Sequence, residues 1–237
     1  MATLELPVRP PRTSHHQGPF INEPFYDFRH EDTARKMRAA IERVRGELGG
    51  EYDLIIGGQR LKTTDKIKSL NPSRPSQVVG IHQKAGKEHV EPAMAAALKA
   101  FESWKNTSVE ERASLLFRTA DLLRDRKMEH MAWLVFEVSK NWAEADADIS
   151  EAIDFCEFYA REALRFAKAE PPVQMPGERD SLTYIPLGVG AVIPPWNFPC
   201  AIMAGLVVAS IVSGNTVILK PSSDSPTIAA KFVELLE

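Results

Sequence analysis

The sequence of 237 residues has 29 basic and 32 acidic side chains, a net charge of −3, and 44% hydrophobic residues. This composition predicts a soluble globular protein, and the absence of basic clusters argues against nucleic acid or an acidic membrane as a partner. Two cysteines are too few for a disulfide framework, and no secretory leader or 18-residue apolar run is present, so we expect a cytoplasmic protein.

The first part of the chain is predicted to be irregular, then helical, then extended. Residues 1–30 are rich in proline, arginine and histidine and lack periodicity, so we expect a flexible arm. The stretch EDTARKMRAAIERVRGELGG has apolar residues at helical spacing and ends in two glycines, which predicts a helix over residues 31–50. Short strands are then predicted to pair as a hairpin at Gly57–Gly58, and VVGIHQK is a further strand candidate.

Residues 87–170 carry a helical pattern throughout. Ser108 and Glu111 form the spacing of a capping box before ERASLLFRTADLLRDR. A later helix places Ile149, Ile153 and Cys156 on one face, and Pro171–Pro172 is predicted to end it. Residues 31–172 are therefore predicted to form an amino-terminal helical part that also contains the short hairpin.

The pattern changes after residue 172. Residues 173–187 are predicted to form an exposed ribbon. From residue 188 the order is strand, helix, strand, helix, with Pro226 in the first turn of the last helix. This order predicts the start of a doubly wound parallel sheet, so the fold class is α/β. The last helix lacks a stop signal, and we expect the sequence to be a fragment of a longer protein.

Two loops follow the predicted parallel strands, at the edge where open α/β sheets bind ligands. One carries Asn197 among prolines and apolar residues, and the other begins with Lys220. Asn197 could cap the following helix, or its amide could stay free to donate a hydrogen bond to a developing oxyanion. Lys220 could bind a nucleotide, or it could be a solvated lysine at a strand end.

The segment GVGAVIPPWNFP, followed by NTVILKPSS, resembles the aldehyde dehydrogenase superfamily. The segments NPSRPSQVVG and EVSKNWAEADADISEAIDFCEFYARE are similar to one branch of it, the L-glutamate γ-semialdehyde (1-pyrroline-5-carboxylate) dehydrogenases. The resemblance implies oxidation of L-glutamate 5-semialdehyde to L-glutamate in proline degradation, with NAD as cofactor. It also implies a homo-oligomer for the full-length protein, assembled through a ribbon such as residues 173–187.

The resemblance also assigns roles to single residues. It implies that the Asn197 amide binds the thiohemiacetal oxyanion and that Lys220 reaches the adenosine ribose of the cofactor. The segment that lies along the cofactor matches Ile193, Pro194, Pro195 and Trp196. Many NAD-preferring members have a glutamate where this chain has Ser223, and serine does not repel a 2′-phosphate, so the resemblance allows NADP as well as NAD.

Glu151 matches a glutamate near the amino-acid end of the substrate in that branch, although it could also be an exposed helical acid beside Asp146, Asp148 and Asp154. Neither cysteine matches the family nucleophile. We expect Cys156 to be a core thiol, and we expect a helix N-terminus to lower the pKa of Cys200 somewhat.

The nucleophilic cysteine and the general-base glutamate are expected beyond residue 237, so the fragment alone is predicted to be inactive. No metal-ligand spacing is present. Two alternatives stay open: an aldehyde dehydrogenase that acts on another semialdehyde, and a non-catalytic binding or scaffold module of the same fold.

Overall fold

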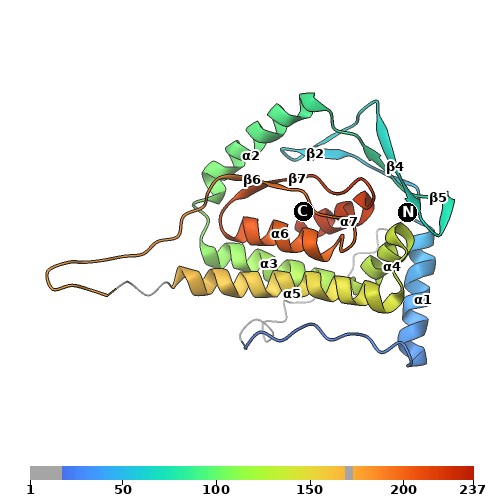
Figure 1. Cartoon of the computed structure of the whole chain (residues 1–237), viewed down its shortest axis with the longest axis horizontal. Helices are drawn as coiled ribbons and strands as arrows, with labels where there is room; N and C mark the ends of the chain where they lie inside the picture. Colours follow the sequence, from blue (N-terminus) through green and yellow to red (C-terminus); the bar gives the residue numbers. More distant parts are fainter. Residues whose placement is uncertain (1–17, 169–172) are drawn as a thin grey trace, which may run out of the picture.

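The computed structural model describes residues 18–168 and 173–237 (Figure 1). Residues 1–17 of the expected arm lie outside this description. Gly18 to His30 form no helix or strand, yet they lie along α5 (Trp142–Ala167), where Asn22 Nδ2 and Glu23 N each donate to Asp154 at 2.7 Å. Side-chain and backbone N–H groups of this segment thus donate to an acid on α5, and the flexibility expected of residues 1–30 stays a prediction.

The predicted first helix is confirmed as α1 (Glu31–Arg45), which buries Met37 and Val44. It ends one turn earlier than the sequence indicated. Gly49 takes a left-handed conformation with φ of 83°, and its N–H donates to Val79 O at 3.0 Å. This turn, which only glycine adopts without strain, directs the chain into the first strand.

Two small sheets follow α1. The hairpin is confirmed: β2 (Leu54–Ile56) and β3 (Gln59–Leu61) are antiparallel, and Gly57 and Gly58 join them with φ of 59° and 78°. Positive φ at both central residues is the requirement of a tight hairpin turn. A three-stranded sheet has the order β1-β5-β4, and its strands are β1 (Gly50–Tyr52), β4 (Lys66–Asn71) and β5 (Arg74–Gln83).

The helical part begins after the short 3₁₀ helix η1 (Lys87–His89). Its helices are α2 (Val90–Trp104), α3 (Val109–Asp125), α4 (Lys127–Val138) and α5. The predicted capping box is confirmed, since Ser108 Oγ accepts a hydrogen bond from Glu111 N at 3.3 Å. Pro171–Pro172, the expected end of α5, lie outside the described residues.

The carboxyl-terminal part has the predicted order. Its elements are β6 (Val189–Val192), α6 (Ala201–Val212), β7 (Thr216–Leu219) and α7 (Pro226–Leu236). β6 and β7 pair in parallel, which confirms the start of a parallel α/β sheet. In Figure 1, α2 lies on one face of this pair and α6 on the other, with α3 and α5 beyond α6.

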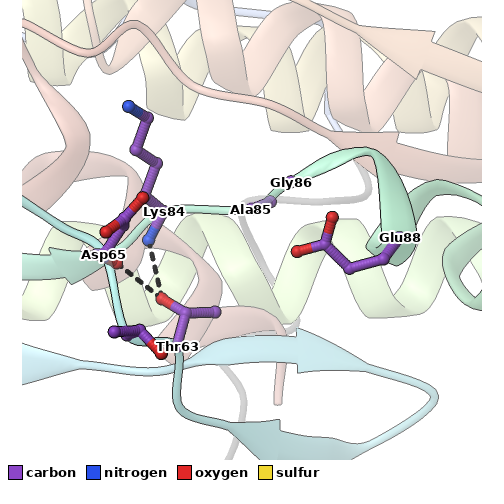
Figure 2. Close-up of a pocket in the computed structure, with 7 residues that line it drawn as sticks. Thr63, Asp65, Lys84, Ala85, Gly86 and Glu88 are labelled. Atoms are coloured by element: carbon purple, nitrogen blue, oxygen red, sulfur yellow. Dashed lines mark hydrogen bonds between the residues drawn. The ribbon is translucent and has the colours of Figure 1, made fainter.

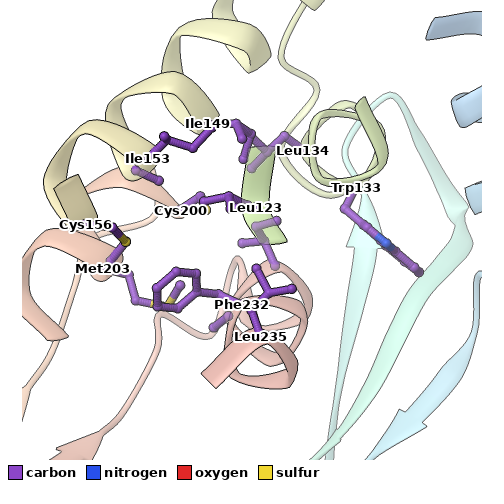
Figure 3. Close-up of a cluster of buried hydrophobic side chains, with 14 of the residues drawn as sticks. Leu123, Trp133, Leu134, Ile149, Ile153, Cys156, Cys200, Met203, Phe232 and Leu235 are labelled. Carbon is purple, nitrogen blue, oxygen red and sulfur yellow. The ribbon is translucent and has the colours of Figure 1, made fainter. Parts of the chain in front are cut away.

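One hydrophobic core joins the helical part to the βαβα unit. Figure 3 shows Ile153 and Cys156 of α5 beside Met203 of α6 and Phe232 of α7, and all four side chains are fully buried. The boundary predicted near residue 188 is therefore a change of topology and not a gap between two cores. The ribbon residues 173–187 form no strand, and they project from the body as an extended loop (Figure 1).

In the described ranges, no helix combines the length and the apolar character needed to cross a membrane.

Candidate active site

Two loops start side by side where β6 and β7 end. The N–H of Lys220 donates to the carbonyl of Val192 at 2.9 Å, which extends the parallel pairing by one residue. Ile193 and Lys220 thus lead out of adjacent strands at the same edge of the sheet. This carboxyl-terminal edge is where open α/β sheets bind their ligands.

The first loop, residues 193–199, presents its apolar residues to solvent. Pro194 and Pro199 are buried and anchor the loop at its two ends, whereas Ile193 is 65% exposed and Trp196 is 56% exposed. Pro195 is also exposed. Exposed apolar side chains held by rigid proline corners form a surface on which a flat ligand can pack.

The side chain of Asn197 is exposed and has no hydrogen-bond partner within the described part of the chain. The residue that precedes α6 is Cys200, and no side chain caps the helix from that position. The helix-capping interpretation of Asn197 is therefore wrong. The amide is free to donate to a ligand.

The cap of α6 comes from a different helix. Asp148 of α5 is fully buried, and its Oδ1 accepts a hydrogen bond from Ala201 N at 2.7 Å. Its Oδ2 lies 2.8 Å from Lys140 Nζ. Burial raises the pKa of Asp148, and the Lys140 ammonium opposes this shift. The start of α6, and with it the end of the first loop, is fixed to α5 by this carboxylate.

A second buried carboxylate caps α7 in the same way. Glu137 of α4 accepts hydrogen bonds from the N–H groups of Thr227 and Ile228 and from the Ser69 hydroxyl, each at 2.7 Å. Burial raises the pKa of Glu137 above its usual value. The second loop, residues 220–225, ends where α7 begins, so Glu137 anchors its far end.

The sequence analysis missed both capping acids. The available signal was the helical stripe: Asp148 shares a face with Ala152 and Cys156, four and eight residues on, and both are buried. Glu137 likewise follows buried Trp133 by four residues. An acid on an apolar stripe indicates a buried carboxylate with a specific partner.

The second loop offers polar groups to solvent. Lys220 is exposed, and its Nζ donates to the carbonyl of Pro221 at 3.0 Å. Ser223 is exposed as well. A single exposed carbonyl contact is weak, so the Lys220 ammonium remains available to a ribose or phosphate.

Glu151 is exposed on α5, one turn after the Asp148 cap. Partial burial and the Asp148 charge raise the pKa of Glu151, while the Lys140 charge opposes the shift. The exposure of Glu151 agrees with the alternative interpretation of an exposed helical acid, whereas the neighbouring acids are engaged in contacts. Asp146 is buried 2.8 Å from Lys127, Asp148 caps α6, and Asp154 accepts hydrogen bonds from the 18–30 segment. Glu151 differs from them because no hydrogen bond occupies its carboxylate in the described residues.

Both cysteines are buried and unpaired. Burial raises the pKa of the Cys156 thiol to about 12, and it also raises the pKa of Cys200. The expected lowering of the Cys200 pKa by a helix N-terminus is therefore wrong, because desolvation outweighs the helix dipole. Two buried neutral thiols cannot serve as nucleophiles.

Figure 2 shows a polar cavity to which neither of these two loops contributes a lining residue. It has a volume of about 200 Å³ and lies between the β3–β4 connection and the segment that leads to α2. Its polar lining includes Thr63, Asp65, Lys84 and Glu88. None of the residues predicted to form the site contributes to its lining. Within the described residues, no group of three or more metal-ligating side chains is present.

The fold and the two loops define the class of this protein. The aldehyde dehydrogenase family model matches residues 60–237, and the chain belongs to that family. The 1-pyrroline-5-carboxylate dehydrogenase of Geobacillus thermodenitrificans (strain NG80-2) is 53% identical over 219 residues, which are 92% of this chain and 42% of that protein. The 1-pyrroline-5-carboxylate dehydrogenase 2 of Bacillus subtilis (strain 168) is 52% identical over the same coverage.

Solved structures give the same assignment. The crystal structure of 1-pyrroline-5-carboxylate dehydrogenase from Thermus with bound NAD superposes with a TM-score of 0.88 at 50% identity, covering 92% of this chain and 43% of that chain. The chain thus spans less than half the length of these similar proteins.

Proposed function

We propose that this chain is part of an NAD-linked dehydrogenase that oxidises L-glutamate 5-semialdehyde, the open form of 1-pyrroline-5-carboxylate, to L-glutamate. The observation that carries the proposal is the exposed, unpartnered Asn197 amide at the ligand edge of the sheet. The 53% identity to the Geobacillus 1-pyrroline-5-carboxylate dehydrogenase supports this choice among aldehydes. Because the chain covers 42% of that relative, the nucleophile and general base are expected in the rest of the protein.

The residues at the two loops fit a dinucleotide. Ile193 and Trp196 offer exposed apolar surface, and Lys220 offers an exposed ammonium within the adjacent loop. An ammonium can donate to the hydroxyl groups of a ribose, and the apolar surface can pack along the cofactor. NAD, when bound, supplies the hydride acceptor of the reaction. Pro194 and Pro195 hold the backbone of this loop rigid.

Asn197 is proposed to donate a hydrogen bond to the aldehyde oxygen as negative charge develops on it. A thiolate that adds to the carbonyl carbon turns the carbonyl oxygen into an oxyanion, and a fixed amide N–H stabilises that charge. An amide engaged as a helix cap could not do this without losing the cap. The Asp148 cap of α6 therefore leaves Asn197 available.

Glu151 is proposed to bind the α-ammonium group of the substrate. Its carboxylate is free of hydrogen bonds in the described residues, and its turn of α5 lies next to the start of α6 through the Asp148–Ala201 contact. A carboxylate and an ammonium group form a charge-assisted pair. This pairing separates an amino-acid semialdehyde from simple aldehydes of the same length.

Three further properties of the complete protein are proposed. Ser223 leaves room for a 2′-phosphate, so we propose that NADP is used beside NAD. The extended loop of residues 173–187 exposes Val173, Ile185 and Leu187, and we propose that it contacts a second copy of the protein. Both cysteines are free thiols, which supports a reducing compartment such as the cytoplasm.

An aldehyde panel tests the function. The complete protein should form NADH fastest with L-glutamate 5-semialdehyde, and the Glu151→Gln variant should lose much of this preference over butyraldehyde. Asn197→Ala should lower kcat by about 100-fold or more, the usual effect of removing one oxyanion donor. Equal rates with aldehydes that lack the α-amino and carboxylate groups would reject the proposed substrate. An unchanged kcat in Asn197→Ala would reject the oxyanion role.

A further inference from the structure

The connection between α4 and α5 brings a cation to the loop of Asn197. Lys140 lies in this connection, after Ser139, which has a left-handed backbone with φ of 54°. Lys140 Nζ lies 2.8 Å from Asp148 Oδ2 and 4.0 Å from the centre of the Phe198 ring. One ammonium group therefore contacts both the acid that caps α6 and the aromatic residue that directly follows Asn197.

These contacts hold the loop at two places. The Phe198 ring packs against the Lys140 cation, and the first N–H of α6, that of Ala201, is bound by Asp148 at 2.7 Å. Asn197 has no hydrogen bond of its own among the described residues, so its neighbours determine where its amide points. A cation over an aromatic face and a buried ion pair both have defined geometry.

We propose that Lys140 is a positioning residue for Asn197, which acts through Phe198 and Asp148 to fix the loop that receives the aldehyde oxygen. The proposal rests on the oxyanion role of Asn197 proposed above. Removing the ammonium leaves the buried Asp148 carboxylate without its counter-charge and releases the Phe198 ring. A displacement of about 1 Å in a catalytic group can lower a rate by roughly 100-fold.

Helix α5, which carries Asp148, also carries Asp146, and the ion pair of Asp146 supplies a matched control. Lys127 and Asp146 form a second buried pair at 2.8 Å, and both side chains are 1% exposed. Lys127 Nζ also donates to Pro24 O at 2.9 Å, so this pair anchors the 18–30 segment and not the loop of Asn197. Lys127→Met and Lys140→Met remove the same group from comparable buried pairs, which separates loss of folding stability from loss of positioning.

The test measures kcat, KM and melting temperature for the complete protein and its variants, with kcat expressed per folded molecule. Lys140→Met should lower kcat by roughly 10- to 100-fold, with less than about a threefold change in the KM for aldehyde. Lys140→Arg keeps the cation and should recover most of kcat. Lys127→Met should lower the melting temperature as much as Lys140→Met does, while keeping kcat within about twofold of the wild type.

A second measurement does not depend on activity. Hydrogen exchange of the Ala201 amide should become at least about tenfold faster in Lys140→Met and stay unchanged in Lys127→Met. Unchanged exchange, or equal losses of kcat in the two methionine variants, would overturn the positioning role. If the wild-type protein does not oxidise the semialdehyde, the proposed function fails, while the exchange result still decides whether Lys140 holds the loop.

Discussion

The cap on α7 gives a prediction whose size follows from the structure. Glu137→Ala removes the acceptor of three donors, which are Thr227 N, Ile228 N and the Ser69 hydroxyl. The hydroxyl can turn to another acceptor, but the two N–H groups are fixed at the helix start. Each buried donor left without a partner costs about 1–3 kcal/mol, so the two together cost about 4 kcal/mol.

Part of this cost is offset, because alanine also removes a carboxylate that burial disfavours, as the raised pKa of Glu137 indicates. We therefore expect Glu137→Ala to lose about 3 kcal/mol of folding free energy, or roughly 6–12 °C of melting temperature in a chain of this length. Glu137→Gln keeps one acceptor oxygen and should fall between the wild type and Glu137→Ala.

The assay is thermal unfolding followed by circular dichroism, with hydrogen exchange of the Thr227 amide as the local measurement. Glu129→Ala is the control on the same helix, since Glu129 pairs with the half-exposed Arg43 at 2.8 Å and should cost less than about 1 kcal/mol. The reasoning would be refuted if Glu137→Ala melted with the wild type, or if the Thr227 amide kept its protection.

Three further predictions concern pH, cofactor choice and thiol chemistry. Burial lowers the pKa of His82 from 6.5 to about 4, so the folded protein binds this proton less well than the unfolded chain does. The contribution of neutral His82 to the free energy of unfolding is therefore complete above pH 6.5 and falls by about 3 kcal/mol as the pH drops to about 4. Unfolding of the His82→Gln variant should not show this loss. Ser223→Glu should raise the ratio of kcat/KM for NAD to kcat/KM for NADP by at least about tenfold in steady-state kinetics, because a carboxylate repels a 2′-phosphate. An unchanged ratio would show that Ser223 does not face the ribose. Cys156 and Cys200 should react with iodoacetamide only after unfolding, as counted by mass spectrometry, and rapid labelling of the native protein would contradict their burial.

Features set by neighbouring residues could be predicted from the sequence. Two consecutive glycines specify the hairpin at Gly57–Gly58, and the Ser108–Glu111 spacing specifies a helix cap. The order of strand and helix after residue 188 follows from two β-branched runs, each followed by proline and then by a helical pattern. Each of these signals lies within a few residues of the structure that it specifies.

Features that join distant segments could not be predicted. The Asp148 carboxylate binds an N–H group 53 residues further along the chain, and Glu137 binds one 90 residues away. The backbone N–H of Glu23 donates to Asp154 at a separation of 131 residues, a contact that composition alone does not indicate. In the site, the motif predicted a role for Asn197. That its amide is not used as the cap of α6 could not be predicted, because the cap comes from Asp148 on a distant helix.

The shared core of α5, α6 and α7 has a consequence for recombination within the family. Met203 of the βαβα unit packs against helices that come before residue 168. A chimera that takes residues before 188 from one family member and the rest from another would therefore pair core faces from two different proteins. A transplant that carries α5 (Trp142–Ala167) together with residues 189–237 keeps these packed surfaces paired. The segment that can be exchanged as a unit is therefore longer than the nucleotide-binding topology by itself would indicate.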